Sequence, residues 1–321
     1  MTAPRVVCCG EALVDFIATD IGGDLWRAVP GGSPFNAAIA AGRLGAPTSF
    51  LGVLSEDRFG QMLTKRLAQS HVAHAQCPTT AEPTAIAVVT EGSYGRAGEP
   101  SFSFHVAGTT TTSTRVNDLH LPADLGVLHV SGSVALVVEP SASRIENLLA
   151  AAQHRAIVHL DPNPRPALID RDRFVRRLGR WLGLADVVKV SEADLAWIAP
   201  GADPIDVAHR WLTGGGDPDV HEELPTAVVV TRGSAGATAV LQGGVVEVPA
   251  PPVDVADTVG AGDAFSGAML AAFAAHGITT PGELRRLDST WWRTALTYAV
   301  EAAGIACSRV GADPPWRHEL H

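Results

Sequence analysis

The residues best suited to chemistry lie in one short segment, DTVGAGDAF, which covers Asp257–Phe265. Gly260, Ala261 and Gly262 precede Asp263, and an apolar run of helical composition follows. The first amides of a helix have no acceptor within the helix, and together with the helix dipole they can hold an oxyanion. A carboxylate beside them could accept a proton from a hydroxyl that attacks a bound phosphoryl group, which typically contributes about 10²–10⁴-fold to a rate. Asp263 could also simply cap its helix, so the local sequence leaves both roles open.

Two common phosphate-binding motifs do not fit this segment. A P-loop requires a lysine directly after a glycine, whereas neither Lys65 nor Lys189 follows a glycine. A dinucleotide-binding fingerprint requires a third glycine where Phe265 stands, and the residues before the turn form a weak strand pattern. The sequence therefore excludes a Walker site and disfavours a dinucleotide-dependent oxidoreductase.

The elements that would position this turn alternate along the chain. Short β-branched runs typical of buried parallel strands cover residues 5–10, 48–53, 125–132, 156–161, 186–190 and 226–233. Between them, helical periodicity covers residues 33–45, 58–70, 139–154 and 172–183. This alternation predicts an α/β fold with a doubly wound, mostly parallel sheet flanked by helices, in a single domain over residues 1–321.

Two segments depart from the alternation. Residues 17–30 are polar and contain glycines where a crossover helix is expected. Residues 84–112 contain two alternating strand patterns around the turn SYGRAGEP, which is typical of a β-hairpin. We expect the two segments to form a small β element that stands off the main sheet and serves as a lid or as an oligomer contact.

The bulk composition limits the classes of partner. The 321 residues are 46% apolar and 18% charged, and the formal net charge is −10. This composition suits a soluble globular protein and disfavours nucleic acid or an anionic membrane as the main partner. Cys8, Cys9, Cys77 and Cys307 show no CxxC spacing and are expected to be buried, reduced thiols. The histidines form no convincing metal set, and no secretory or membrane-spanning run is apparent, so we expect a cytoplasmic protein.

The segment around Asp263 closely resembles the C-terminal signature of the ribokinase-like (PfkB-type) carbohydrate kinases, and the resemblance extends along nearly the whole chain. A single block would be weak evidence, but seven blocks occur in the expected order. They cover Gly10–Phe16, Pro30–Gly45, Asp57–Gly60, Leu160–Ile169, Val187–Leu195, Val230–Gly236 and Asp257–Phe265. The resemblance implies a ribokinase-like fold with a small β lid.

The resemblance gives roles to individual positions. Asp263 matches the catalytic base of the family, and the amides of Gly260, Ala261 and Gly262 match its anion hole for the transferred γ-phosphate. The positions that match its sugar-binding residues are Asp15, at the end of the first strand, Gly31, Gly32, Asn36 and Arg165. A carboxylate can grip adjacent hydroxyls, and glycines let the backbone approach a sugar closely. Without the resemblance, these residues are a strand-end aspartate, a turn, a helical asparagine and a loop arginine.

Five further positions match residues that bind ATP in the family: Lys189, Ser191, Thr231, Gly233 and Gly236. The family often carries an Asn-x-x-Glu motif that organises Mg²⁺ through water, and Ser191 and Asp194 stand at the aligned positions. Both keep oxygen ligands, but the aspartate is shorter by one methylene, so metal handling could shift partly to Glu192. The structural alternative is a helix capped by Ser191, with Asp194 as the third residue of a capping box.

A monovalent cation site is also implied by the resemblance. Many relatives bind such an ion beside the anion hole. Asp257 and the backbone near Val259 match one side of that site, and Cys307–Ala312 resembles the other side. The implied cofactors are ATP and Mg²⁺, and a dependence on K⁺ is left open.

The resemblance therefore implies an ATP-dependent sugar kinase that transfers the γ-phosphate to a primary hydroxyl, with a sugar and ATP as small-molecule partners. The blocks are most like the fructokinase branch, so fructose is the expected substrate. The alternatives are 2-keto-3-deoxygluconate, whose carboxylate would need a partner such as Arg96 in the hairpin turn, and ribose or a nucleoside. A non-catalytic sugar- or nucleotide-sensing protein is a rival of another class. A homodimer formed through the lid is compatible with the sequence.

Overall fold

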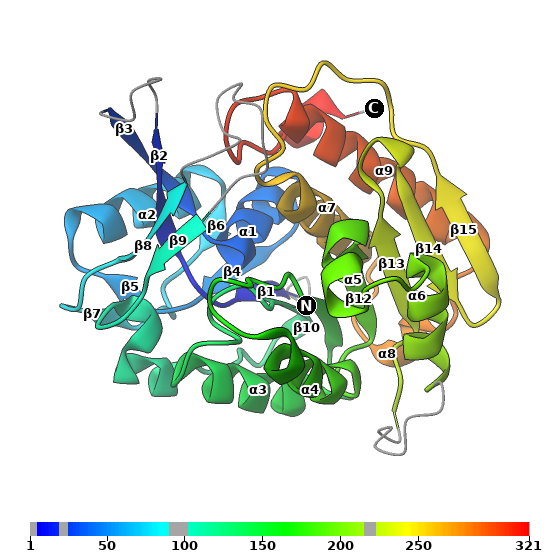
Figure 1. Cartoon of the computed structure of the whole chain (residues 1–321), viewed down its shortest axis with the longest axis horizontal. Helices are drawn as coiled ribbons and strands as arrows, with labels where there is room; N and C mark the ends of the chain where they lie inside the picture. The colour runs from blue at the N-terminus through cyan, green and yellow to red at the C-terminus, as the bar shows by residue number, and fades with distance from the viewer. Residues whose placement is uncertain (1–4, 19–24, 90–101, 215–222, 321) are drawn as a thin grey trace.

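The β-branched runs of the sequence form the centre of a nine-stranded sheet in the computed structural model (Figure 1), which describes residues 5–18, 25–89, 102–214 and 223–320. From edge to edge the strands are β15 (Gly244–Val248), β14 (Ala237–Leu241), β13 (Ala227–Thr231), β12 (Val187–Ser191), β11 (Ile157–Asp161), β10 (Leu125–Ser131), β1 (Arg5–Cys9), β4 (Thr48–Leu51) and β6 (Val72–Ala73). Neighbouring strands are parallel except that β14 runs antiparallel to β13 and β15. The predicted α/β class and mostly parallel sheet are confirmed.

Helices cover both faces of this sheet, which explains why its strands are almost continuously apolar. One face packs against α1 (Ser33–Arg43), α2 (Arg58–Gln69), α7 (Ala261–Ala275), α8 (Pro281–Leu284) and α9 (Ser289–Cys307). The other face packs against α3 (Ser141–Ala152), α4 (Arg171–Leu182), α5 (Glu192–Ile198) and α6 (Pro204–Thr213). Alternate residues of each strand supply the two cores, as Val187 and Val188 of β12 illustrate.

The central helices α1 and α7 lie unusually close together. A methyl group added at Gly267 of α7 would stand 2.3 Å from Cβ of Ala40 in α1, so only a glycine fits at this crossing. Every residue of α1 is buried. This packing fixes the N-terminal ends of both helices relative to each other, and those ends carry the predicted site residues.

A second sheet of four strands stands beside the main sheet, and Figure 1 shows β2 and β3 projecting beyond the rest of the molecule. Its order is β3 (Trp26–Gly31), β2 (Leu13–Ala18), β8 (Ala85–Val89) and β9 (Phe102–His105). The predicted hairpin is confirmed by the antiparallel pairing of β8 with β9. Its turn, residues 90–101 with Arg96, and residues 19–24 lie outside the described residues.

The sequence placed the start of this second sheet too late. Its first strand begins at Leu13 rather than near residue 17, so Asp15 lies within β2 and not at the end of the first strand. The cause is Gly10, whose φ of +148° ends β1 and turns the chain out of the main sheet. Asp15 therefore approaches the site from the second sheet.

Short elements complete the described chain. They are the strands β5 (Leu54–Ser55) and β7 (Thr79–Thr80) and the 3₁₀ turns η1 (Thr110–Thr112), η2 (Thr114–Asp118), η3 (Gly233–Ala235) and η4 (Arg317–Glu319). All four cysteines are free thiols: Cys8 and Cys9 are buried, and Cys77 and Cys307 are partly buried. Among the described helices, none has the length and apolar character needed to cross a membrane.

The chain order of the strands reverses between β1 and β10. From β1 the chain passes to β4 and β6 on one side, and from β10 it passes to β11, β12 and β13 on the other. In open α/β sheets, ligands bind at such a switch point, beyond the carboxyl ends of the strands. The residues that follow β1, β10 and β11 are therefore the first place to look for a site.

A pair of histidines is buried at the centre of the main sheet. His129 on β10 and His159 on β11 are cross-strand neighbours, and both are fully buried. Their Nδ1 atoms lie 2.9 Å apart, so one ring donates a hydrogen bond to the other. Burial lowers the pKa of His129 to about 3 and the pKa of His159 well below its ordinary value, and the charge of Lys189 acts in the same direction.

Because of this histidine pair, we expect the free energy of unfolding to fall in mild acid. Below about pH 6.5 the unfolded chain binds protons at both histidines, whereas the folded chain keeps both rings neutral. Each histidine therefore lowers the free energy of unfolding by up to about 1.4 kcal/mol for every pH unit below that value. Buried carboxyl groups also change the stability of the protein in acid. The contribution of the histidines is therefore measured by comparing urea unfolding of the wild type with that of a His129→Gln/His159→Gln variant. Equal pH dependence in the two proteins would contradict the prediction.

Candidate active site

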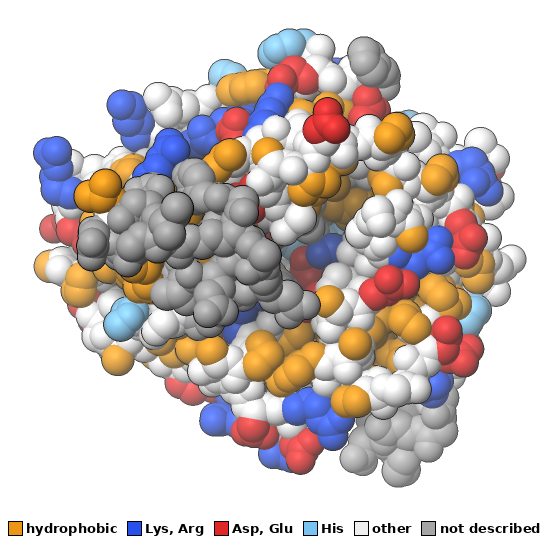
Figure 2. Space-filling model, turned by 45° about the horizontal axis from the view of Figure 1, so that its top comes forward, with side chains coloured by type: hydrophobic (Ala, Val, Ile, Leu, Met, Phe, Trp, Pro, Cys, Tyr) orange, Lys and Arg blue, Asp and Glu red, His pale blue; other side chains and the backbone are white. Residues whose placement is uncertain are grey.

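A cavity of about 210 Å³ lies where the second sheet meets the N-terminal ends of α1 and α7. It is lined by Leu13, Asp15, Gly32, Ser33, Asn36, Phe104, Ser133, Arg165, Thr258, Val259, Gly260 and Asp263. One face of the molecule is hollowed, with acidic and basic side chains at the bottom of the hollow (Figure 2). The fold thus brings the predicted base together with most of the predicted sugar-binding positions.

Asp263 is held by two residues of α1. Ser33 Oγ donates to Asp263 Oδ1 at 2.6 Å, and Asn36 Nδ2 donates to Asp263 Oδ2 at 2.9 Å. Burial raises the pKa of Asp263, while these two hydrogen bonds and the charge of Lys189 act to lower it. The amide of Asn36, expected to face a sugar hydroxyl, is thus used to orient the carboxylate. Both oxygens of Asp263 are fixed at the edge of the cavity.

The turn before Asp263 has the geometry of a helix start. Gly260 has φ +78°, and a methyl group there would stand 2.6 Å from Cβ of Ala312. The amide of Ala264 closes the first turn onto the Gly260 carbonyl at 2.8 Å, and the amide of Ala261, expected to be free, donates to Thr258 at 3.3 Å. The amides of Gly262 and Asp263 occupy the first turn, where an α-helix offers no acceptor. An anion could be held by these two amides.

The second sheet brings another carboxylate to the cavity. A methyl group added at Gly31 of β3 would stand 2.0 Å from Asp15 Oδ2, so a glycine is needed beside this side chain. Burial raises the pKa of Asp15 to about 7; the charge of Arg165 opposes this shift, and the charges of Asp263 and Glu11 add to it. Gly32 begins α1 at φ +104°. Asp15 and Arg165 thus both line the cavity, close enough for the charge of Arg165 to act on the Asp15 carboxyl group.

Lys189, predicted to bind ATP, is buried beneath the first turn of α7. It is 4% exposed on β12, and its Nζ lies 2.8 Å from Oδ2 of Asp161 on β11. A methyl group added at Gly262 would stand 2.9 Å from the same nitrogen, so the ammonium lies beneath the first turn of α7. Burial acts to lower the pKa of Lys189, but the charges of Asp161, Asp194 and Asp263 outweigh it and raise the pKa.

The predicted magnesium residues form a capping box in the structure. Ser191 Oγ donates to Asp194 Oδ2 at 2.6 Å and accepts from the Asp194 amide at 3.0 Å. Glu192 is exposed. Among the described residues, no group of three or more histidines, cysteines or carboxylates is placed to hold a metal ion. A magnesium ion here would have to depend on waters and phosphate oxygens, as Mg²⁺ commonly does.

The other residues predicted to bind ATP lie at the end of β13, the strand next to β12, and in the turn after it. Thr231 ends β13 and pairs with Ser191 at the end of β12. Gly233 and Gly236 bound the turn η3 with φ of +52° and +92°. A methyl group at Gly236 would stand 2.0 Å from the Val248 carbonyl, so the turn is folded tightly against β15. These residues lie toward the carboxyl ends of the strands of the main sheet, as do Asp161 and Lys189.

Asp257 joins the two segments predicted to hold a monovalent cation. Its Oδ1 accepts from the Val259 amide at 3.0 Å, and its Oδ2 accepts from the Gly311 amide at 2.9 Å. The amide of Asp257 itself donates to the Cys307 carbonyl at 3.1 Å. The structure thus brings the two segments together, with the carboxylate engaged by backbone amides.

Ser33, Asp161, Ser133 and Phe104 were not among the predicted site residues. Ser33 and Asn36 both contact Asp263, and their spacing of three residues on a helix could have indicated a shared face. Asp161 pairs with Lys189, and Ser133 and Phe104 line the cavity. These three residues follow or belong to strands whose neighbours become known only from the fold.

Comparisons with known proteins agree with this arrangement. Residues 3–319 match a family model described as pfkB family carbohydrate kinase. A fructokinase from Rhizobium leguminosarum bv. trifolii is 34% identical over 287 residues, which are 88% of this chain and 84% of the relative. A fructokinase from Klebsiella pneumoniae is 38% identical over 277 residues, which are 85% of this chain and 86% of the relative.

Solved structures share the whole fold. A fructokinase from Xylella fastidiosa with bound ATP superimposes with a TM-score of 0.84 at 29% identity, over 96% of this chain and 93% of the other. A double mutant of a fructokinase from Vibrio cholerae, solved with fructose, ADP and potassium, superimposes with a TM-score of 0.81 at 26% identity, over 97% and 95% of the two chains. The described sheets and helices therefore follow a fold that these kinases share.

Proposed function

The chain belongs to the pfkB family of carbohydrate kinases, and we propose that it phosphorylates fructose at a primary hydroxyl with MgATP as the donor. The observation that carries this proposal is the placement of Asp263. Its carboxylate is fixed by Ser33 and Asn36 at the edge of the cavity, next to the first amides of α7. A proton acceptor and an anion site side by side are what phosphoryl transfer to a hydroxyl requires.

In the proposed reaction, the sugar hydroxyl lies between the Asp263 carboxylate and the γ-phosphorus. The oxygen of the hydroxyl attacks the phosphorus in line as its proton passes to Asp263, and the bond to the β-phosphate oxygen breaks. The amides of Gly262 and Asp263 donate to the oxygens of the transferred group, where charge develops. Asp15 and Arg165, which also line the cavity, would hold the remaining hydroxyls of the sugar.

We propose that the nucleotide lies along the ends of β12 and β13, next to Thr231, Gly233 and Gly236. Mg²⁺ bound with ATP would neutralise charge on its phosphate oxygens, with Asp194 and Glu192 reached through water. The other oxygen of Asp161, Oδ1, is buried and has no hydrogen-bond partner in the described part of the chain, and it fits a water of such a magnesium shell. K⁺ would lie between the segments that Asp257 joins.

The second sheet is proposed to act as a lid on the sugar. It supplies Leu13, Asp15 and Phe104 to the lining, so it covers one side of the cavity. Closure over a bound sugar would exclude water and limit the hydrolysis of ATP in the absence of an acceptor.

The proposal is tested with a panel of sugars in a coupled assay of ADP release, with MgATP and with or without K⁺. We expect fructose to give the highest kcat/KM, and K⁺ to increase it. A preference for 2-keto-3-deoxygluconate, ribose or a nucleoside would replace fructose and leave the kinase assignment intact. Sugar or ATP binding without any turnover would instead indicate a sensing protein and contradict the proposal.

A further inference from the structure

Glu11 is a buried carboxyl group to which the proposed reaction gives no task. It stands between β1 and β2, where the chain passes from the main sheet to the second sheet, and it is 4% exposed. Its Oε2 accepts a hydrogen bond from the amide of Ala135 at 3.0 Å. Its Oε1 is buried and has no hydrogen-bond partner among the residues that the structure describes. An unpaired buried polar atom costs about 1–3 kcal/mol, so a carboxyl group here needs a compensating role.

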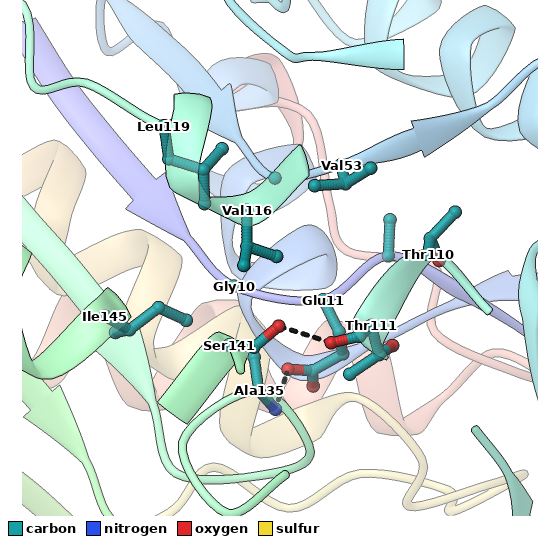
Figure 3. Close-up of a pocket in the computed structure, with 12 residues that line it drawn as sticks. Gly10, Glu11, Val53, Thr110, Thr111, Val116, Leu119, Ala135, Ser141 and Ile145 are labelled. Carbon is teal, nitrogen blue, oxygen red and sulfur yellow. Dashed lines mark hydrogen bonds between the residues drawn. The ribbon is translucent and has the colours of Figure 1, made fainter. Parts of the chain in front are cut away.

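A small cavity lies against this carboxyl group (Figure 3). Thr111 lines it as well, and Thr111 Oγ1 is also buried and unpaired within the described ranges. Figure 3 shows the side chains of Glu11 and Thr111 next to each other, with Val116 and Ile145 on the apolar side. The cavity leaves about 10 Å³ for the centre of a water-sized sphere. One water needs about 10–15 Å³ of such space and two or more polar partners, and the two unpaired oxygens provide them.

Several passages of the chain between the two sheets meet at this point. Glu11 lies on the passage from β1 to β2, and Thr111 lies in η1, on the return from β9 to the main sheet. Ser141 of α3 donates from its hydroxyl to the Thr111 carbonyl, which ties that return to the helix layer. A methyl group added at Gly32, on the passage from β3 to α1, would stand 2.7 Å from the Glu11 carbonyl oxygen. Glu11 thus contacts the places where the second sheet is attached.

The same carboxyl group is linked to the sugar cavity. Ser133 lines that cavity, and its side chain acts to lower the pKa of Glu11 against the stronger effect of burial. Ala135, which donates to Glu11, lies on the same turn after β10. On the other side, Asp15 of β2 follows Glu11 by four residues in the chain. A change at Glu11 would therefore move both the turn that carries Ser133 and the strand that carries Asp15.

We propose that Glu11 is a positioning residue for the sugar site, and that one buried water joins its Oε1 to Thr111 Oγ1. Through the Ala135 amide and this water, the carboxyl group sets the orientation of the second sheet on the main sheet, and with it the position of Asp15 in the cavity. The inference rests on the proposed function, because it takes that cavity to be the place where the sugar binds.

The test is a double-mutant cycle with Glu11→Met and Thr111→Val, which nearly keep the size of each side chain and remove the oxygens that would hold the water. Steady-state kinetics use the sugar that the wild type phosphorylates best. Each single variant is expected to raise the KM for the sugar about tenfold, with kcat and the KM for ATP little changed. The double variant is expected to show no more than the larger single effect, because both changes break the same bridge. Thr111→Ser, which keeps the hydroxyl, is expected to restore the wild-type KM.

Matched controls are Glu56→Met and Thr294→Val, at exposed positions, which should leave both KM values unchanged. Three results would overturn the inference while the kinase assignment stands: an unchanged sugar KM in the variants, fully additive effects, or a parallel loss of kcat and melting temperature without a specific rise in the sugar KM. A wild type that phosphorylates no sugar of the panel would refute the proposed function, and the inference would fall with it.

Discussion

An Asp263→Asn variant is expected to lose about 10²–10⁴-fold in kcat while it binds ATP almost as tightly as the wild type. The amide has nearly the same size as the carboxylate, and its oxygen can still accept the hydrogen bond from Ser33. It has no charge and no free basicity with which to take the proton of a sugar hydroxyl. Turnover is measured by ADP release, and ATP affinity is measured by titration calorimetry in the absence of sugar.

The pH dependence of the same pair of proteins sharpens this test. Burial raises the pKa of Asp263 above the ordinary value of 3.8, although the hydrogen bonds from Ser33 and Asn36 oppose the shift. Wild-type kcat is expected to fall as the pH drops through this raised pKa, because a protonated carboxyl group cannot act as a base. That acid limb should be missing from the residual activity of the variant.

Asp288→Asn is the matched control for this variant. Asp288 caps α9 through the Trp291 amide at 2.8 Å, and asparagine is an equally good cap. The control should keep wild-type kcat and the wild-type pH profile. An Asp263→Asn variant with undiminished turnover would show that Asp263 serves only to join α7 to α1 through Ser33 and Asn36.

The sheet and its helices could be predicted from the sequence because their signals are local. Strands such as β10 and β12 are buried on both faces, so each is a short and almost continuous apolar run. The turn before Asp263 could also be predicted, because a glycine directly before an apolar helix suits a positive φ, and Gly260 has φ +78°. Each of these features depends on residues that are close together in the chain.

The contacts that complete the site could not be predicted, because they join distant parts of the chain. Ser33 and Asp263 are 230 residues apart in the sequence and 2.6 Å apart in the structure. The start of the second sheet was missed because one glycine, Gly10, turns the chain out of β1 before the strand pattern ends. Lys189 was expected at the nucleotide because its neighbours match that region, but its pairing with Asp161 depends on the register of β11 and β12.

The second large effect is expected at Lys189. A Lys189→Met variant leaves the Asp161 carboxylate buried without the ammonium that lies 2.8 Å away, and both side chains are almost fully buried. Removing one partner of a buried ion pair typically costs about 3–5 kcal/mol of folding free energy. We therefore expect a large fall in the free energy of unfolding, measured in urea. Lys65→Met is the matched control, because Lys65 is the other lysine of the chain and lies exposed on α2.

A Lys189→Met/Asp161→Asn double variant separates stability from catalysis. Removing both charges removes the unpaired carboxylate, so most of the lost stability is expected to return. Turnover is expected to stay at least about tenfold below the wild type, because the ammonium under the first turn of α7 no longer offsets the charge that develops on the transferred phosphoryl group. If stability and turnover return together, Lys189 serves only to neutralise Asp161. If stability returns and turnover stays lower than in Asp161→Asn alone, the positive charge beside Gly262 acts in the reaction itself.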